Sequence, residues 1–455
     1  MGVCNLSQRS FEDDLLIVLA RPMMITTDVA TKGFRRQVKR FVQAPGQRFA
    51  VIVPPGLSGV CRRELAELSL AGDEVQEGVL EVAGKWATCY QLNLWLRTAS
   101  RILCRLPTFR AGVIGELSHK VLSFPWELWL NPKIPLVLQC RAQQSRIHHE
   151  GLIGTAILGA IQRRFADQGL AVPTRYAPAG KRTEQRFAEV QQGSLPRPHT
   201  RNETRFTGHD QSVRWKQRFL VHLHRNHCEI SLDTSGPHLH QRGYRLQHAG
   251  APLRETLAAG ILLQTNWNGD RPLVDGMCGA GTVAIEAALL ARHLPPGLNR
   301  EFLFSQWPSF QEKTWAHFRR KAQESALPHA PAPILGLDQD GGALGIAMHN
   351  AARAGVAESI RWHCMDFFAF NPDALGLARG VLVLDPPYGM RLAGSGNVRA
   401  FYQRLGSHLH RFYRGWQVAV AAPNAELATL LKISSAHLWR IPHGGIPLVV
   451  SLAQL

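Results

Sequence analysis

The chain has 455 residues, which is enough for about three domains with buried cores. Its 52 Lys and Arg residues outnumber its 34 Asp and Glu residues, and the formal net charge of +18 favours a polyanionic partner; an evenly spread basic surface, or one attracted to anionic membranes, is the alternative. No apolar run reaches the roughly 18 residues of a membrane-spanning segment, which disfavours a membrane-embedded role. The 8 cysteines include no CxxC pair, which disfavours a zinc ribbon, an iron–sulfur cluster and a disulfide framework.

Residues 1–47 are predicted to form a basic N-terminal extension. They lack the charged-then-apolar order of a secretory signal, and three acids at positions 12–14 disfavour a transit peptide, so the expected location is the cytoplasm. The basic cluster at 32–40 is as consistent with an RNA-contacting arm as with an ordinary solvated face.

Residues 48–110 predict a small α+β domain. Apolar periodicity changes repeatedly between the values typical of strands and of helices. The expected elements are a strand from Phe49, a helix over 61–69, a single strand over 75–82, a helix over 86–94 and a strand over 101–106.

Residues 111–245 predict a second module with a strand at 134–140 and a helix at 151–165. The turn between them carries Arg146, His148 and His149. A metal site at the two histidines is a poor interpretation, because adjacent residues of an extended strand point to opposite faces. The range 219–232 alternates as one closing strand.

The segment 179–218 of this module loses its apolar period. It contains nine Lys or Arg residues against four acids, with Phe187, Phe206 and Trp215 interleaved. Such aromatics stack on unpaired bases while arginines hold phosphates, which would make the segment an RNA-reading element. A disordered basic insertion is the slightly favoured alternative.

The range 272–290 predicts a strand, a Gly-rich turn and a helix. Asp275 ends the strand, and Gly279 and Gly281 allow a ligand close approach to the helix N-terminus. The turn lacks both the third glycine of a dinucleotide fingerprint and the Lys of a phosphate loop, which favours another nucleoside. Cys278 in this turn is expected to be a small packing residue rather than a nucleophile.

Further acids follow the next predicted strands. Asp338 ends a strand at 333–338 and is suited to ribose hydroxyls, and Asp366 follows a strand at 359–364. Asp366 and Phe367 together suit an adenine, the acid by hydrogen bonding its amine and the ring by packing beside it. Each acid alone is at least as consistent with a solvated loop, but ligands of open α/β sheets gather at the carboxyl ends of strands.

The most specific pattern is an apolar strand at 381–384 followed by Asp385, Pro386, Pro387 and Tyr388. A nucleobase amine is a poor nucleophile until acceptors redirect its lone pair, and the Asp385 carboxylate and Pro386 carbonyl could both accept hydrogen bonds from it. The prolines stiffen the turn and Tyr388 would stack on the base. An ordinary strand stop is the alternative.

With these motifs the chain resembles the class I S-adenosylmethionine-dependent RNA methyltransferases that modify guanine N2, especially the bacterial large-subunit rRNA enzymes. The resemblance extends from about Phe49 to the C-terminus. Beyond the Gly-rich turn and the Asp-Pro-Pro-Tyr motif, it is carried by the stretches 93–101, 232–236, 242–245, 251–258 and 296–300.

The resemblance implies an α/β fold in which a Rossmann-like methyltransferase domain at 246–455 follows a ferredoxin-like domain at 48–110 and a THUMP RNA-binding region at 111–245. It implies S-adenosylmethionine as cofactor, RNA as partner, direct in-line methyl transfer and no metal. The implied cofactor residues are Asp275, Cys278, Gly279, Gly281, Thr282, Asp338 and Asp366. The residues implied to hold the target base are Asp385, Pro386, Pro387 and Tyr388. The implied RNA contacts are Arg146 and His148.

One departure from the family pattern bears on the substrate. The rRNA enzymes usually carry Asn where this chain has Asp385, and Asp also occurs in tRNA guanine-N2 and DNA adenine methyltransferases. A tRNA substrate, or another amine such as DNA adenine N6 or a protein glutamine, therefore stays open as an alternative. A non-catalytic RNA-binding or assembly factor that kept the fold is a separate alternative.

Overall fold

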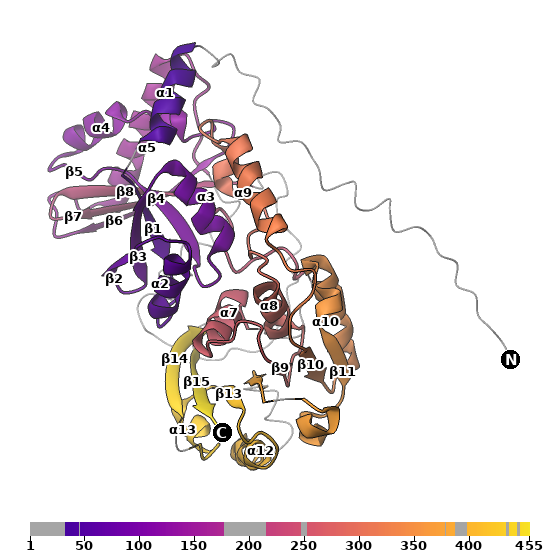
Figure 1. Ribbon diagram of the computed structural model, residues 1–455. Helices are drawn as coiled ribbons and strands as arrows, with labels where there is room; N and C mark the ends of the chain where they lie inside the picture. The colour runs from indigo at the N-terminus through magenta and orange to yellow at the C-terminus, as the bar shows by residue number, and fades with distance from the viewer. Residues whose placement is uncertain are drawn as a thin grey trace.

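A computed structural model describes residues 32–44, 46–176, 215–246, 253–377, 379–386, 398–433, 436–443 and 446–455. The elements form an N-terminal module and a C-terminal domain, each built on its own sheet (Figure 1). The C-terminal domain corresponds to the predicted methyltransferase domain and is called the catalytic domain on that expectation. Within the described residues, no helix is long and apolar enough to cross a membrane.

The N-terminal module contains one continuous sheet with the strand order β2-β3-β1-β4-β8-β7-β6, and β5 pairs with β8. The pairing of β4 with β8 joins the strands of the two predicted front domains into this single sheet. Its elements are α1 Lys32–Gln43, β1 Gln47–Ile52, α2 Ser58–Glu67, β2 Asp73–Gln76, β3 Val79–Gly84, α3 Trp86–Trp95, β4 Arg101–Arg105, β5 Phe109–Arg110, α4 Ile114–Ser123, η1 Trp126–Leu128, β6 Leu136–Gln143, α5 Glu150–Asp167, β7 Gln217–His224 and β8 His227–Asp233.

Two strand predictions in this module were wrong, because a tight turn divides each range. The range 75–82 is a hairpin of β2 and β3 that reverses at Gly78, whose φ of 73° is left-handed. The range 219–232 is a hairpin of β7 and β8, with Arg225 and Asn226 both at positive φ as a two-residue hairpin turn requires. Side-chain alternation continues on both sides of such a turn, so periodicity alone does not show it.

Most of the segment 179–218 lies outside the described residues. The described part, from Trp215, leads directly into β7 at Gln217. The last two residues of the predicted insertion are therefore strand residues, a correction to its boundary.

The catalytic domain contains a second sheet with the order β11-β10-β9-β12-β13-β15-β14. The first five strands are parallel and β15 is antiparallel to both neighbours, which confirms the predicted α/β class. Its elements are α7 Glu255–Gln264, β9 Leu273–Asp275, α8 Thr282–Ala291, η2 Leu303–Gln306, α9 Glu312–Glu324, β10 Ile334–Asp338, α10 Gly341–Ala354, η3 Ala357–Ser359, β11 Arg361–Cys364, η4 Phe367–Ala369, η5 Pro372–Leu375, β12 Val381–Leu384, α12 Val398–Phe412, β13 Gln417–Ala422, α13 Ala425–Thr429, β14 His437–His443 and β15 Ile446–Gln454.

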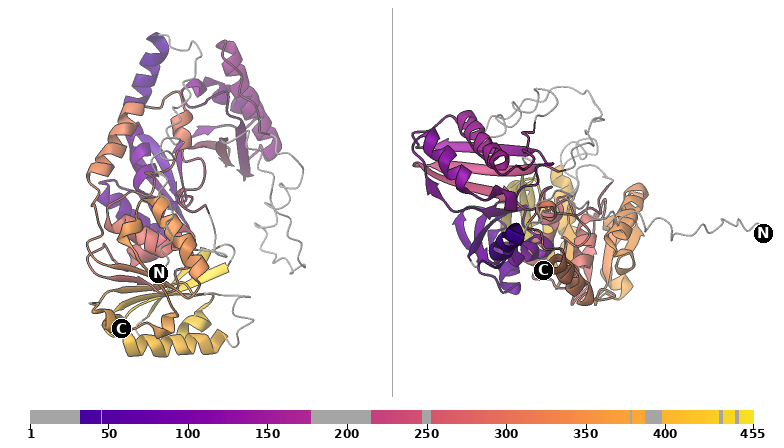
Figure 2. Two further views of the ribbon diagram at one scale, coloured as in Figure 1. Left: turned by 90° about the vertical axis from the view of Figure 1, so that its right-hand side faces the viewer. Right: turned by 90° about the horizontal axis from the view of Figure 1, so that it is seen from above.

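Alternation along β12 divides the core of this domain into two layers. Val381 and Val383 pack in the cluster that includes α8, whereas Leu382 and Leu384 pack in the cluster that includes α12. Figure 2 shows these helices on opposite faces of the sheet. Because both faces are covered, the strands are apolar throughout, as expected for a parallel sheet.

Buried polar contacts fasten the module to the catalytic domain. The Arg97 side chain donates to the carbonyl of Leu294 at 2.8 Å, and Gly297 N donates to the carbonyl of Leu94 at 3.0 Å. On β14, Trp439 Nε1 donates to the carbonyl of Gly56 at 3.0 Å. The N-terminal module is thereby held at a fixed place beside the catalytic sheet.

Candidate active site

Four of the predicted acids lie along one edge of the catalytic sheet. Asp275 ends β9, Asp338 ends β10, Asp385 directly follows β12, and Asp366 lies two residues beyond β11. These strands are neighbours in the order β11-β10-β9-β12, and chain order reverses direction between β9 and β12. Ligands of open α/β sheets bind at this switch point, outside the carboxyl ends of the strands.

Asp275 is almost completely buried at the centre of this edge. Its Oδ2 accepts a hydrogen bond from Ala284 N in the first turn of α8 at 3.1 Å. Burial raises the pKa of Asp275 well above its usual value, and the nearby carboxylates of Asp385 and Asp338 raise it further. Asp275 therefore positions α8 and belongs to a compact group of carboxylates.

Asp338 is half-buried and orders the Gly-rich turn. Its Oδ2 accepts from Gly279 N at 2.8 Å, and its Oδ1 accepts from Asp340 N at 2.9 Å. Each carboxylate oxygen can accept a further hydrogen bond, so ribose contact stays compatible with this support role.

The two predicted glycines differ in their surroundings. Gly279 has a φ of 50°, and a Cβ placed there would meet nothing within 4 Å, so this position leaves room for a ligand. Gly281, at the N-cap of α8 with a φ of 80°, has no such room, because a Cβ would lie 2.8 Å from the Trp362 ring and 2.9 Å from the Ala347 side chain. The local packing of α8 against α10 already requires glycine at 281.

Cys278 and Thr282 are buried on either side of these glycines. Burial raises the pKa of the Cys278 thiol well above its usual value, and Asp275 and Asp338 raise it further. A neutral thiol fits packing better than nucleophilic chemistry. The Thr282 hydroxyl accepts from Arg245 Nη1 at 3.2 Å.

Asp366 is exposed and starts η4, where its Oδ1 accepts from Phe368 N at 3.0 Å. Phe367 is buried under the sheet, where its ring stacks with Tyr413 at 5.8 Å between centroids. The Phe367 ring also lies against Gly276, because a Cβ at Gly276 would be 2.6 Å from it, and its packing beside an adenine stays a prediction. Two consecutive residues of a short helix point in different directions, so the ring lies in the core while the acid faces outward.

Asp385 has the most unusual environment of the four acids. In the described part of the chain, no group donates a hydrogen bond to its buried Oδ1. Burial raises the pKa of Asp385 from 3.8 to about 7. A buried acceptor without a donor is costly, so the position suits a ligand that supplies an N–H or O–H group. Pro386 is buried beside it, while the predicted Pro387 and Tyr388 lie outside the described residues.

Arg146 and His148 are exposed on the turn before α5, in the N-terminal module. Arg146 N donates to the Asn226 side chain, which anchors this turn to the β7–β8 hairpin. His149 Nδ1 accepts from Leu152 N at the N-terminus of α5, a capping role. The structure does not bring Arg146 and His148 together with the four acids, and their contact with RNA stays a prediction.

Sequence reasoning missed two side chains that support the Gly-rich turn. Asn350 on α10 donates to the carbonyl of Ala280 at 3.1 Å, and Arg245 reaches Thr282 from the segment that follows β8. Neither stands in a pattern that predicts its partner. Both contacts depend on how distant segments pack.

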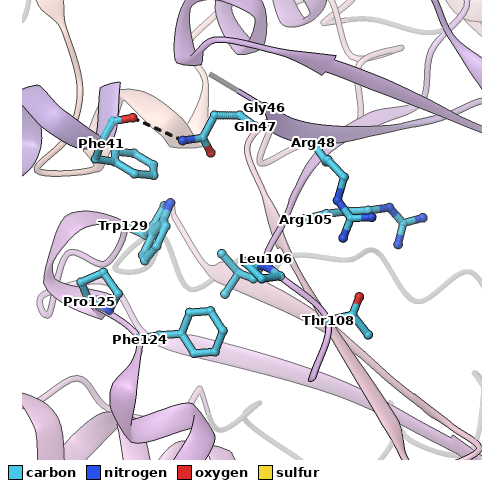
Figure 3. A pocket seen from close by; sticks show the side chains of 11 residues that line it. Phe41, Gly46, Gln47, Arg48, Arg105, Leu106, Thr108, Phe124, Pro125 and Trp129 are labelled. Atoms are coloured by element: carbon cyan, nitrogen blue, oxygen red, sulfur yellow. Dashed lines mark hydrogen bonds between the residues drawn. The ribbon is translucent and has the colours of Figure 1, made fainter. Parts of the chain in front are cut away.

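A cavity of about 640 Å³ lies in the N-terminal module, away from the four acids (Figure 3). Phe41, Phe124 and Trp129 line its apolar part. Arg48 and Arg105 lie at its other side and both pair with Glu81. None of the predicted site residues lines this cavity. Groups of three or more potential metal ligands are likewise absent from the described residues.

Comparisons with known proteins agree with this geometry. Residues 242–445 match the model of the RMKL-like methyltransferase domain, and residues 48–103 match the RlmL ferredoxin-like domain. The Bacillus subtilis protein YpsC is 31% identical over 78% of this chain and 82% of its own length. The ribosomal RNA large subunit methyltransferase K/L of Syntrophotalea carbinolica is 32% identical over 88% of this chain, which spans 52% of that enzyme.

A solved structure supports the same relationship. SMU.472, crystallised in complex with S-adenosylhomocysteine, aligns with 90% of this chain and 99% of its own at a TM-score of 0.73 and 25% identity. Both the switch-point geometry and these similarities lead to one conclusion. The chain belongs to the family of methyltransferases that share the RMKL-like catalytic domain.

Proposed function

We propose that this protein transfers a methyl group from S-adenosylmethionine to the exocyclic N2 amine of a guanine in RNA, and that large-subunit rRNA is the favoured substrate. The observation that carries the proposal is the buried Oδ1 of Asp385, which lacks a donor among the described residues at the switch point of the sheet. Relatives named as ribosomal RNA large subunit methyltransferases support the choice of substrate.

The residues at the sheet edge fit the proposed cofactor. The space beside Gly279 admits a ligand, and Asp338 and the exposed Asp366 offer acceptors for a ribose and an adenine. The group of carboxylates at Asp275, Asp338 and Asp385 favours a cationic ligand over a phosphate-bearing one. When bound, S-adenosylmethionine supplies an electrophilic methyl group on a positively charged sulfur.

Asp385 performs the main step assigned to the protein. Its carboxylate accepts a hydrogen bond from the target NH2 and stabilises the positive charge that develops on the nitrogen. With a pKa raised to about 7 by burial, Asp385 is also able to take up the proton that the nitrogen loses after transfer. The Pro386 carbonyl is the second proposed acceptor, and Tyr388 is proposed to stack on the base.

A tRNA guanine is the second candidate substrate, because Asp385 replaces the Asn that is usual in the rRNA enzymes. Incubation with labelled S-adenosylmethionine and separate pools of unmodified large-subunit rRNA, tRNA and DNA distinguishes these cases. Label in rRNA is expected. Label in tRNA alone would keep the chemistry and change the substrate, whereas label in DNA alone, or in none of the pools, would overturn the proposal.

A further inference from the structure

The segment that connects β8 to the catalytic domain lies among several arginines. It contains His238 and His240, whose rings stack at 5.5 Å between centroids. Arg300 approaches from the catalytic domain and donates to the carbonyls of Pro237 at 2.8 Å and of His238 at 2.9 Å. We call Arg218, Arg254, Arg300, His238 and His240 the junction cluster.

The arginines around this segment outnumber the acids that face them. Asp233 pairs with the buried Arg101 and lies 3.9 Å from Arg218, so one carboxylate serves two guanidinium groups. Arg300 uses three backbone carbonyls as acceptors, and the exposed Glu301 is its neighbour in sequence. Arg242 and Arg245 of the same segment pair with Glu286 and Glu255, so with Glu301 counted six arginines face four carboxylates.

Arg254 adds to this excess from the N-cap of α7. Its side chain is exposed, and in the described part of the chain it forms no ion pair. The N-terminus of a helix is itself positive, and the acid in the first turn of α7, Glu255, already pairs with Arg245, so Arg254 adds a further positive charge at this helix end.

Burial is the main cause of the low pKa values of His238 and His240, and the surrounding positive charges add to it. Burial lowers the pKa of His238 to about 4, and Arg101, Arg218 and Arg254 lower it further. Burial also lowers the pKa of Arg300 to about 9, with a further contribution from Arg242. The histidines are therefore neutral near pH 7, which leaves the arginines as the cations that an anion would meet.

An aromatic side chain completes the surface. Trp215 packs on Gly236, where a Cβ would lie 2.9 Å from its ring. The carbonyl of Gly236 accepts from Arg101 Nη1 at 2.6 Å, and Arg101 shares Asp233 with Arg218, so the tryptophan lies near this group of arginines. Aromatic rings next to arginines are typical of surfaces that bind single-stranded nucleic acid, whereas free phosphate needs no ring.

The connecting segment continues toward the candidate active site. Arg245 near its end reaches Thr282 beside the Gly-rich turn, and Arg353 Nε donates to the carbonyl of Tyr244 at 2.8 Å. The junction cluster thus lies on the chain path between the N-terminal module and the cofactor turn.

We propose that the junction cluster binds the phosphates of the RNA strand next to the target nucleotide, with Trp215 as a stacking surface for an unpaired base. This inference rests on the proposed function, since it assumes an RNA substrate. The RNA strand would then enter at the junction between the two parts of the protein rather than along the N-terminal module alone.

The test is a double variant, R218A with R254A, in the full-length protein. A matched control removes two exposed arginines, R361A with R414A, at the opposite, amino edge of the catalytic sheet. Binding of an unmodified large-subunit rRNA transcript is measured by fluorescence anisotropy across several salt concentrations. Thermal melting and calorimetric titration with S-adenosylmethionine verify folding and the cofactor site.

The slope of log affinity against log salt should fall by about 2 in the junction variant, because each lost phosphate contact removes about 1. Unchanged melting and cofactor binding are expected. A slope equal to that of the control would overturn the inference. R254A alone, at an exposed position, should lower the slope by about 1 and serves if the double variant misfolds. Failure of the proposed function is distinguishable, because the wild type would then bind the transcript without methylating guanine.

Discussion

Replacing Asp385 with Asn removes the titrating carboxyl group and keeps the shape of the side chain. Burial raises the pKa of Asp385 from 3.8 to about 7, and at 1.36 kcal/mol per pH unit this corresponds to roughly 4 kcal/mol. The folded protein holds the proton more tightly than the unfolded chain does. The contribution of Asp385 to the free energy of unfolding is therefore fully present below about pH 4 and is lost as the pH rises toward 7.

Asp385→Asn removes this penalty because an amide does not ionise in the range. The free energy of unfolding of D385N relative to the wild type should rise by up to roughly 4 kcal/mol between pH 4 and pH 8 and should level off above pH 7. Urea unfolding of both proteins at a series of pH values measures this difference. A difference that does not change with pH would refute the buried, donor-free environment assigned to Asp385.

The same titration should appear in catalysis. Only the ionised carboxylate carries the negative charge that stabilises the developing ammonium, so the single-turnover rate of the wild type should rise about tenfold from pH 6 to pH 8. D385N keeps a carbonyl acceptor and should show a lower rate that is flat over this range. A wild-type rate that is independent of pH would contradict the role given to Asp385.

Further variants test the target-base site, the Gly-rich turn and the segment 179–218. D385A should abolish methyl transfer, and calorimetry should show nearly unchanged cofactor affinity. Full retained activity would contradict the proposed role of Asp385 in methyl transfer. Gly281→Ala should lower the free energy of unfolding of the catalytic domain by about 1–3 kcal/mol in urea, because the new Cβ would contact Trp362. Gly279→Ala should lower it by about 1 kcal/mol or less and should mainly weaken cofactor binding. Equal stability losses in the two variants would argue against the open space at Gly279. Deletion of residues 179–213, which stops before β7, should weaken RNA binding and its salt dependence without changing the melting temperature, and unchanged affinity across salt concentrations would refute a contact with RNA.

The sequence predicted the positions of the acids better than their surroundings. Asp275, Asp338 and Asp385 follow apolar strands, and parallel strands place their carboxyl ends at one edge, so their grouping follows from pattern and topology. The burial of Phe367 and the support of Ala280 by Asn350 depend on how helices pack across the sheet. No local pattern encodes such contacts.

The N-terminal module shows the same limit at the level of strands. Two ranges that alternate as single strands are hairpins, because alternation does not reveal a two-residue turn such as Arg225-Asn226. The pairing of β4 with β8 joins segments more than 120 residues apart in the chain, as the pair Leu103 and Asp233 shows. Such pairing is specified by tertiary packing rather than by either strand alone.

The central claim is that the site at Asp385 methylates the N2 amine of guanine in RNA. The most direct measurement is mass spectrometry of nucleosides from unmodified large-subunit rRNA treated with S-adenosylmethionine and either the wild type or D385A. N2-methylguanosine formed by the wild type and absent with D385A is the predicted result. Methylation at another atom or base, or equal yields from both proteins, would contradict the claim.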